Sequence, residues 1–260
     1  MKYSVMTMVI IITLFLVTQF VGLAVNNYYN SQELPFGLKP PEVEQKFSPW
    51  FFIGAIFVVN QILFSFKHFN LELLIKLWFF SAFTLGIAVT LSAFIEPMFA
   101  IFAAAAITLM KFYEHDIYTH NLAEVFLYGG IVSLFVPILN IWGAILLLII
   151  VSVYDFVSVF MTKHMIQLAQ MQEGLGIFTG LVVSHKNEMA ILGGGDIAFT
   201  MLFAAVLLRD MGLLPALMVV YGAAIGLIAL IMIGEKKKFY PAMPFITAGS
   251  LLGFVISLIL

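Results

Sequence analysis

Residues 141–163 read IWGAILLLIIVSVYDFVSVFMTK and decide the class of fold. About 20 consecutive apolar residues cross a bilayer as a helix, and Asp155 is the one acid inside this apolar run. An ionised carboxylate in hydrocarbon is costly, so such a residue usually faces a wet cavity or a partner and marks a proton, ion or catalytic site. A second aspartate, Asp196, closes the motif GGGD at 193–196 in another apolar segment. The two acids together suggest a carboxylate pair.

The composition places the whole chain in a membrane. Hydrophobic residues make up 63% of the sequence, charged residues make up 10%, and the mean hydropathy is +1.09. No water-soluble globular protein has this balance, so the chain is a polytopic membrane protein. It has no cysteine, which excludes disulfides, a thiolate nucleophile and a zinc-thiolate site. The only cationic cluster, Lys236–Lys238, reads as a topology anchor, and no basic run indicates nucleic acid.

The apolar segments predict nine membrane-spanning helices in an all-α membrane protein. Approximate spans are 4–25, 49–66, 71–94, 97–113, 122–139, 141–163, 189–208, 212–234 and 239–260. We therefore expect one membrane domain over 1–260. Spans 1 to 6 occupy 1–163, a loop follows at 164–188, and spans 7 to 9 occupy 189–260.

Basic residues predict the orientation of these spans, because short cytoplasmic loops are enriched in Lys and Arg. Eight lysines fall on one side of the membrane: Lys2, Lys67, Lys111, Lys163, Lys186 and Lys236–Lys238. The other side has Lys39, Lys46 and Arg209. This count predicts a multi-pass protein of the cell membrane with a cytoplasmic N-terminus, a cytoplasmic 164–188 loop and an extracytoplasmic C-terminus.

Helix geometry converts the positions of the two aspartates into depths. Span 6 reaches Lys163 eight residues after Asp155, and span 7, taken as a helix from Glu188, reaches Asp196 eight residues later. At the rise of an α-helix, both carboxyl groups lie about 12 Å from the cytoplasmic boundary. Equal depth on adjacent antiparallel spans supports the pairing.

Glycines add a second feature at residues 193–195. Three consecutive glycines allow the backbone to leave helical geometry, which is tolerated at membrane depth where it is buried in protein or lines a wet cavity. We therefore assign these glycines to the site that contains Asp196. By contrast, Gly222-x-x-x-Gly226 and Gly249-x-x-x-Gly253 are typical of close helix packing.

Three short motifs carry a resemblance to a known family. Tyr154-Asp155 matches a YD motif, Gly193-Gly194-Gly195-Asp196 matches GxGD, and Pro241-Ala242-Met243 stands in place of Pro-Ala-Leu. Their order on the sixth, seventh and ninth spans resembles the presenilin and signal-peptide-peptidase family of intramembrane aspartyl proteases. The inferred orientation resembles the presenilin branch, and the compact chain is most similar to archaeal presenilin homologues. Met243 departs from the motif by a change that conserves volume.

The resemblance implies an aspartic endopeptidase that cuts transmembrane segments. It implies Asp155 and Asp196 as catalytic residues, supported by Tyr154, Gly193, Gly194, Gly195, Pro241, Ala242 and Met243. Two neighbouring carboxyl groups in a site of low dielectric cannot both ionise, so the pair shares one proton. One carboxylate then activates water while its protonated partner hydrogen-bonds the scissile carbonyl. No metal or organic cofactor is needed. For Tyr154 the residues themselves favour a packing role.

The implied partners are transmembrane helices that arrive through the lipid bilayer; assembly into a homo-oligomer stays open. A helical substrate must unwind before it is cut, and its freed backbone then needs hydrogen-bond partners. We expect strand-like pairing with the loop at 170–190, around Gly174 to Val183.

The chain has no His-Glu-x-x-His and no Gly-x-Ser-Gly, which argues against intramembrane zinc and rhomboid-like serine proteases. His115 and His120 flank Asp116 in a predicted solvated loop. A proton- or ion-coupled transporter also uses glycine-broken helices with intramembrane carboxylates, and the residues alone support it nearly as well. An inverted repeat would favour transport, but the first half of the chain has no counterpart of Tyr154-Asp155 or of residues 193–196. A catalytically silent scaffold with the same fold also stays open.

Overall fold

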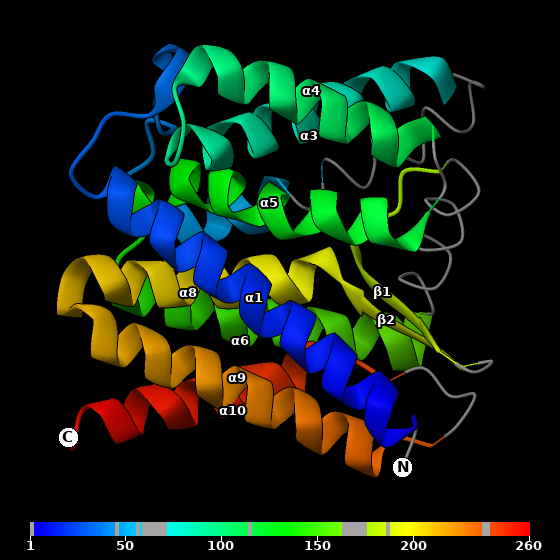
Figure 1. The fold of residues 1–260 in the computed structure, drawn as a ribbon. Helices are drawn as coiled ribbons and strands as arrows, with labels where there is room; N and C mark the ends of the chain where they lie inside the picture. Colours follow the sequence, from blue (N-terminus) through cyan, green and yellow to red (C-terminus); the bar gives the residue numbers. More distant parts are fainter. Residues whose placement is uncertain are drawn as a thin grey trace.

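The structure is a bundle of helices with one short β-hairpin at one end (Figure 1). It is a computed structural model that describes residues 3–44, 47–55, 58, 72–113, 116–162, 176–185, 188–235 and 240–260. The α-helices are α1 (Val5–Tyr29), α3 (Glu72–Ser92), α4 (Pro97–Tyr113), α5 (Ile117–Phe135), α6 (Ile141–Val157), α8 (Gly194–Met211), α9 (Leu213–Ile233) and α10 (Met243–Ser257). Residues 48–55 are also helical. Short turns of helix lie at Pro35–Gly37, Val136–Ile138 and, in π geometry, Ser158–Thr162.

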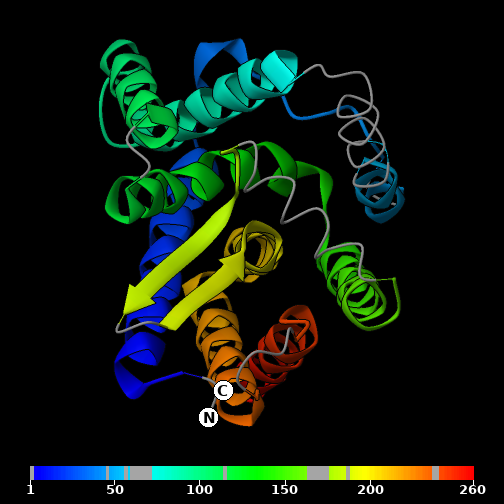
Figure 2. The same ribbon diagram turned by 90° about the vertical axis from the view of Figure 1, so that its right-hand side faces the viewer.

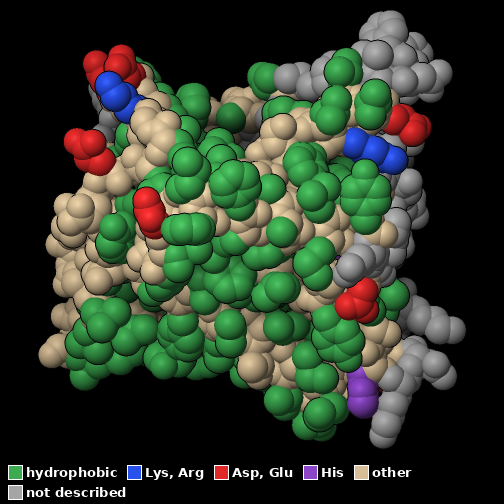
Figure 3. Space-filling view, turned by 45° about the horizontal axis from the view of Figure 1, so that its top comes forward, with side chains coloured by type: hydrophobic (Ala, Val, Ile, Leu, Met, Phe, Trp, Pro, Cys, Tyr) green, Lys and Arg blue, Asp and Glu red, His purple; other side chains and the backbone are tan. Residues whose placement is uncertain are grey.

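This architecture confirms the predicted class. Five helices in the described part are long and apolar enough to cross a membrane: α1, α3, α5 with its 3₁₀ extension, α6 and α9. The helices α4 and α10 are apolar but shorter. Hydrophobic side chains cover the middle of one face, and most of its charged side chains lie toward the two ends (Figure 3). Much of predicted span 2 and of the 164–188 loop lies outside the described residues.

Local capping sets where several helices begin. Asp116 caps α5 by accepting the N–H groups of Tyr118 at 3.1 Å and Thr119 at 3.4 Å. Side-chain acceptors at helix N-termini satisfy N–H groups that have no intrahelical partner. The helix therefore starts at Ile117, five residues before the predicted start of span 5 at 122, and the prediction of a solvated loop at His120 is wrong.

The hairpin replaces the helix that was predicted to begin at 189. Strand β1 (Gly180–His185) pairs antiparallel with β2 (Glu188–Gly193), with Gly180 opposite Gly193 and Val182 opposite Ile191. Burial alternates along β2: Ala190 and Leu192 are buried, whereas Met189 and Ile191 are 57% and 52% exposed. This period of two is that of a strand with one face on the core. The hairpin packs against α1, α5 and α8 (Figure 2).

At its end of the bundle, the hairpin lies between α5 and the pair α9 and α10 (Figure 1). The pair α3 and α4 lies at one edge in Figure 1, α5 comes next, and α9 and α10 lie at the opposite edge. Glu188, the first residue of β2, accepts the N–H of Ser4 at 2.6 Å, so the start of α1 and the start of β2 meet. Helix α10 ends at the other end of the bundle (Figure 1).

Close packing of α9 on α10 follows the predicted glycine pattern. A Cβ on Gly222 would lie 2.1 Å from the carbonyl oxygen of Gly249, and a Cβ on Gly249 would lie 2.1 Å from that of Gly222. Gly226 and Gly253 are equally close to the backbone of the facing helix. No larger residue fits at these four positions, so the prediction of close helix packing is confirmed.

Candidate active site

Asp155 lies in the last turn of α6 and contacts the start of α10. Its side chain is buried, and its Oδ2 accepts the N–H of Met243 at 3.1 Å. Because Ala242 has no side chain that could cap α10, Asp155 caps that helix from a different span. The positive end of the α10 dipole offsets the unfavourable position of a carboxylate at the C-terminal end of α6.

Asp196 lies in the first turn of α8, directly after the hairpin. It stands three residues after Gly193, the residue that precedes the helix, where the acid of a capping box stands. A Cβ on Gly193 would stand 3.2 Å from Asp196 Oδ2, so glycine leaves room for this carboxylate. Asp196 is half-buried, and α8 packs against α6. The last turn of α6 and the first turn of α8 lie at the same end of the bundle, so the two acids are close enough for their charges to interact.

The three glycines differ in what they do. Gly193 is extended, with φ −63° and ψ 148°, so the backbone leaves helical geometry there. The N–H of Gly194 donates to the carbonyl of Thr179 at 3.3 Å, and a Cβ on Gly194 would lie 2.7 Å from the hydroxyl of Tyr128. Gly195 is exposed, and a Cβ on Gly195 would lie 3.8 Å from its nearest neighbour, a ring carbon of Phe199. Of the three positions, only Gly194 has a neighbour too close for a side chain, and at Gly193 the Asp196 carboxylate would have to shift slightly.

The remaining predicted residues lie around Asp155. Pro241 and Met243 are buried and Ala242 is half-buried, and helix α10 begins at Met243, four residues later than predicted. Met243 contacts Asp155 through its backbone N–H, which any residue other than proline provides. Tyr154 is 36% exposed, whereas Asp155 beside it is 7% exposed, so the two side chains point to different surroundings.

The predicted depth of Asp196 is wrong, because the segment before it is not helical. Residues 188–193 form a strand, so the helical rise does not apply between Glu188 and Asp196. The acids are neighbours because each lies at the hairpin end of its helix, in the last turn of α6 and the first turn of α8. Equal residue counts to the boundary were a coincidence.

Sequence reasoning missed a third intramembrane acid. Glu124 on α5 has no exposed surface, and it pairs with Lys111 of α4, whose side chain is 2% exposed. Lys111 was one of the eight lysines counted as loop charges to predict the orientation. In the structure it is instead a buried partner of Glu124. The other seven lysines of that count lie outside the described residues. The rule that singled out Asp155 also applied to Glu124, which stands inside predicted span 5.

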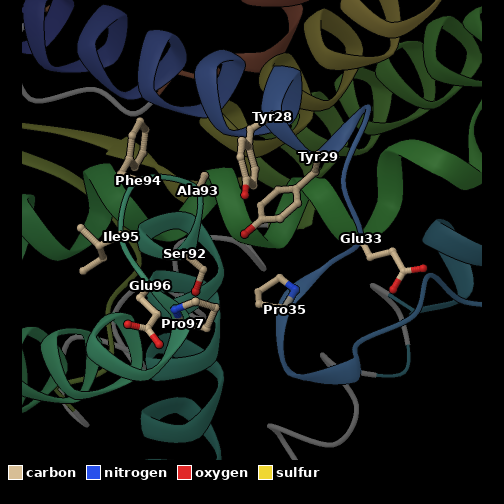
Figure 4. A pocket seen from close by; sticks show the side chains of 10 residues that line it. All are labelled: Tyr28, Tyr29, Glu33, Pro35, Ser92, Ala93, Phe94, Ile95, Glu96 and Pro97. Carbon is tan, nitrogen blue, oxygen red and sulfur yellow. The ribbon is translucent and has the colours of Figure 1, made fainter.

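A cavity lies far from the two aspartates. Its volume is about 360 Å³, and its lining includes Tyr28, Tyr29, Glu33, Glu96 and Pro97 (Figure 4). These residues belong to the end of α1, the segment after it, the turn between α3 and α4 and the start of α4, at the other end of α1 from the hairpin. Within the described ranges, no three His, Cys, Asp or Glu side chains gather to hold a metal ion.

The fold and the site together define a polytopic membrane protein with two interacting intramembrane carboxyl groups. The chain belongs to the family described as signal-peptide peptidase, presenilin aspartyl protease, whose profile matches residues 12–190. That match includes Tyr154-Asp155 and ends before Gly193. Among curated proteins, none matches this sequence.

Two solved structures are similar over almost the whole chain. Both are of a presenilin family intramembrane aspartate protease, in two crystal forms. The P2 form is 22% identical with a TM-score of 0.71 and covers 96% of each chain. The C222 form is 19% identical with a TM-score of 0.65, covering 95% of this chain and 94% of the other. At this identity the likeness is one of fold.

Proposed function

We propose that this protein is an intramembrane aspartic endopeptidase that hydrolyses peptide bonds in the transmembrane segments of other membrane proteins, with Asp155 and Asp196 acting as one catalytic pair. The observation that carries the proposal is geometric: Asp155 in the last turn of α6 and Asp196 in the first turn of α8 lie at the same end of two packed helices, and the N–H of Met243 holds the carboxylate of Asp155. Membership of the aspartyl protease family supports the same reaction class.

The proposed reaction needs only the two carboxyl groups and water. One carboxylate removes a proton from water as the water oxygen attacks the scissile carbonyl carbon, and the protonated partner hydrogen-bonds and then protonates the carbonyl oxygen. The resulting gem-diol collapses as the amide nitrogen leaves with a proton from the pair. Water and peptide together balance as a new carboxyl group and a new amine.

The free edge of β2 is our proposed binding site for unwound substrate backbone. Along an antiparallel pair, backbone groups point alternately toward and away from the partner strand. In β1, the N–H and C=O groups of Gly180 and Val182 point away from β2 and bond to α5 side chains. Leu181 and Val183 therefore point toward β2, and their partners there are Leu192 and Ala190.

It follows that Met189 and Ile191 present their N–H and C=O groups on the other side of the sheet. No described residue outside the hairpin bonds to these groups. The sequence predicts pairing around Gly174 to Val183, of which residues 174 and 175 lie outside the described residues. We propose β2 instead, because α5 side chains bind the outward backbone groups of Gly180 and Val182 in β1. A substrate strand on β2 would run directly toward Asp196.

Replacing Ile191 with proline tests this edge. Proline removes the outward N–H without cutting the β1–β2 ladder, because that N–H faces away from β1. We expect kcat/KM for a transmembrane substrate to fall about tenfold, the effect of one hydrogen bond, with an unchanged melting temperature. Ile191→Val, which keeps the N–H, should cleave normally, and Ala190→Pro should destabilise the hairpin instead. Normal cleavage by Ile191→Pro would refute pairing on β2.

The reaction class itself is tested with purified protein in liposomes that contain a single-span substrate. Mass spectrometry of the products should locate new termini inside the apolar segment, and a hydroxyl-bearing transition-state mimic should prevent their formation. Ion flux measured in the same liposomes tests the alternative that the protein is a proton- or ion-coupled transporter. Flux that requires both Asp155 and Asp196, without any cleavage, would favour transport over proteolysis.

For the orientation, we propose that the hairpin end of the bundle faces the cytoplasm. The natural chain has no cysteine, so single substitutions give a clean measurement. Ser184 in β1 and Ser31 after α1 are both exposed and lie near opposite ends of the bundle. An impermeant thiol reagent applied to intact cells should label Ser31→Cys and leave Ser184→Cys unlabelled until the cells are opened. The reverse pattern would invert the topology.

A further inference from the structure

A buried polar cluster on α4 and α5 lies directly behind the hairpin. It consists of five side chains: Lys111, His120, Asn121, Glu124 and Tyr128. Lys111 Nζ donates to Glu124 and, at 3.1 Å, to the carbonyl of Phe178, and it lies 4.2 Å from the centre of the Phe83 ring. Burying an ion pair is costly and seldom stabilises a fold more than an apolar pair would. The charges of Lys111 and Glu124 are therefore better explained by the other groups that these two side chains bind.

Glu124 joins three elements through one carboxylate. Besides Lys111, it accepts the hydroxyl of Tyr128 and the N–H of Gly180 at 3.0 Å. Gly180 begins β1 with φ +134°, and a Cβ there would lie 2.3 Å from the carbonyl oxygen of Leu192. Only glycine takes this backbone conformation without strain. Glu124 thus fixes the residue at which the hairpin starts.

Two neighbouring side chains complete the attachment of β1. Asn121 accepts the N–H of Val182 at 2.9 Å and donates to the carbonyl of Val182 at 2.6 Å. His120 Nε2 lies 2.8 Å from the carbonyl oxygen of Gly180. The outward N–H and C=O groups of both β1 residues are therefore bound, and α5 takes the place of a third strand.

The cluster reaches the candidate active site through Gly194. The carbonyl of Thr179, next to Gly180, accepts the N–H of Gly194, and the Tyr128 hydroxyl packs against the same glycine. Gly194 stands two residues before Asp196. Any movement of β1 away from α5 would consequently move the start of α8 and the free edge of β2.

We propose that Glu124, neutralised by Lys111, is a positioning residue for the protease proposed above. It holds the hairpin in place before substrate arrives, so that the free edge of β2 and the carboxyl group of Asp196 have a fixed relation. This inference rests on the proposed function for its effect on catalysis. The hairpin geometry can be measured without cleavage.

Two double variants separate the hairpin contact from the ion pair. Lys111→Met/Glu124→Gln removes both charges but keeps a side-chain oxygen for the N–H of Gly180. Lys111→Met/Glu124→Leu removes the charges and that acceptor. Asn121→Ala serves as a third variant that loosens β1 without touching a charge. Thr90→Val is the matched control, because Thr90 is a buried partner of Gly130 on α5, away from the hairpin.

The readouts are amide hydrogen exchange of Gly180 and Val182 without substrate, the melting temperature, kcat and KM. We expect the Gln double variant to keep slow exchange at Gly180 and to retain kcat/KM within about threefold. The Leu double variant should lose that protection and at least about tenfold in kcat/KM while still folded. Asn121→Ala should lose protection at Val182. Thr90→Val should lower the melting temperature only.

Equal exchange and equal kcat/KM for the two folded double variants would overturn the positioning role. If the Leu double variant does not fold, loss of protection without loss of kcat/KM in Asn121→Ala would have the same consequence. Absence of cleavage by the wild type would contradict the proposed protease, whereas the exchange comparison would still decide whether Glu124 holds the hairpin.

Discussion

Replacing either Asp155 or Asp196 with asparagine is expected to abolish peptide-bond cleavage, lowering kcat by about a thousandfold or more. An amide cannot take a proton from water and cannot lend one to the scissile carbonyl, and each step of the proposed reaction needs both carboxyl groups. The measurement is kcat at saturating substrate in liposomes, with product termini identified. Near-normal turnover by either single variant would contradict the paired mechanism.

The fold should survive both replacements. Asparagine has the size of aspartate, and at position 155 its side-chain oxygen still accepts the N–H of Met243. Asp210→Asn provides the matched control, since Asp210 lies on α8 with Asp196 but bonds to Arg209 at the opposite end of that helix. It should lose the ion pair with Arg209 and keep its cleavage rate. An inactive Asp210→Asn would mean that charge on α8, without regard to position, supports activity.

Gly249→Leu is expected to have the second-largest effect. The backbones of α9 and α10 approach so closely that a Cβ at 249 would lie 2.1 Å from the carbonyl oxygen of Gly222, and a rigid main chain cannot move away locally. We expect a loss of more than about 3 kcal/mol in unfolding free energy. Unfolding in mild detergent with increasing denaturant measures this change.

The same substitution should also reduce catalysis in any protein that stays folded. The first turn of α10 donates the N–H of Met243 to Asp155, so separation of α10 from α9 displaces a partner of the candidate catalytic acid. Ala248→Leu, on the exposed side of the same helix, adds three of the four carbons that Gly249→Leu adds and should be silent. If Gly249→Leu unfolded at the same denaturant concentration as the wild type, the glycine contacts would not hold the two helices together.

Helices and their close contacts could be predicted because they depend on local features. Apolar length predicted the spans, and the spacing of Gly222, Gly226, Gly249 and Gly253 predicted the packing of α9 on α10. The hairpin was missed at 188–193. A short apolar run such as Met189 to Leu192 fits a strand and a helix equally, and periodicity cannot separate the two over four residues.

Part of the candidate site could also be predicted from local features of the sequence. Asp155 and Asp196 stood out because they interrupt apolar segments, and the structure makes them neighbours. The contact of Asp155 with Met243 joins residues 88 positions apart, and no local pattern encodes it. Lys111 and Glu124 were visible in the sequence. They were overlooked because Lys111, near the end of a predicted span, was counted as a loop charge.

The most direct test of the account is the binding of a hydroxyl-bearing transition-state mimic to the wild type, Asp155→Asn and Asp196→Asn, measured by calorimetry on folded protein. A hydroxyl held between two carboxyl groups needs both of them, so we expect one mimic per wild-type chain and at least about hundredfold weaker binding to each variant. Unchanged affinity in either variant would show that the mimic, and by extension the reacting carbonyl, does not lie between Asp155 and Asp196.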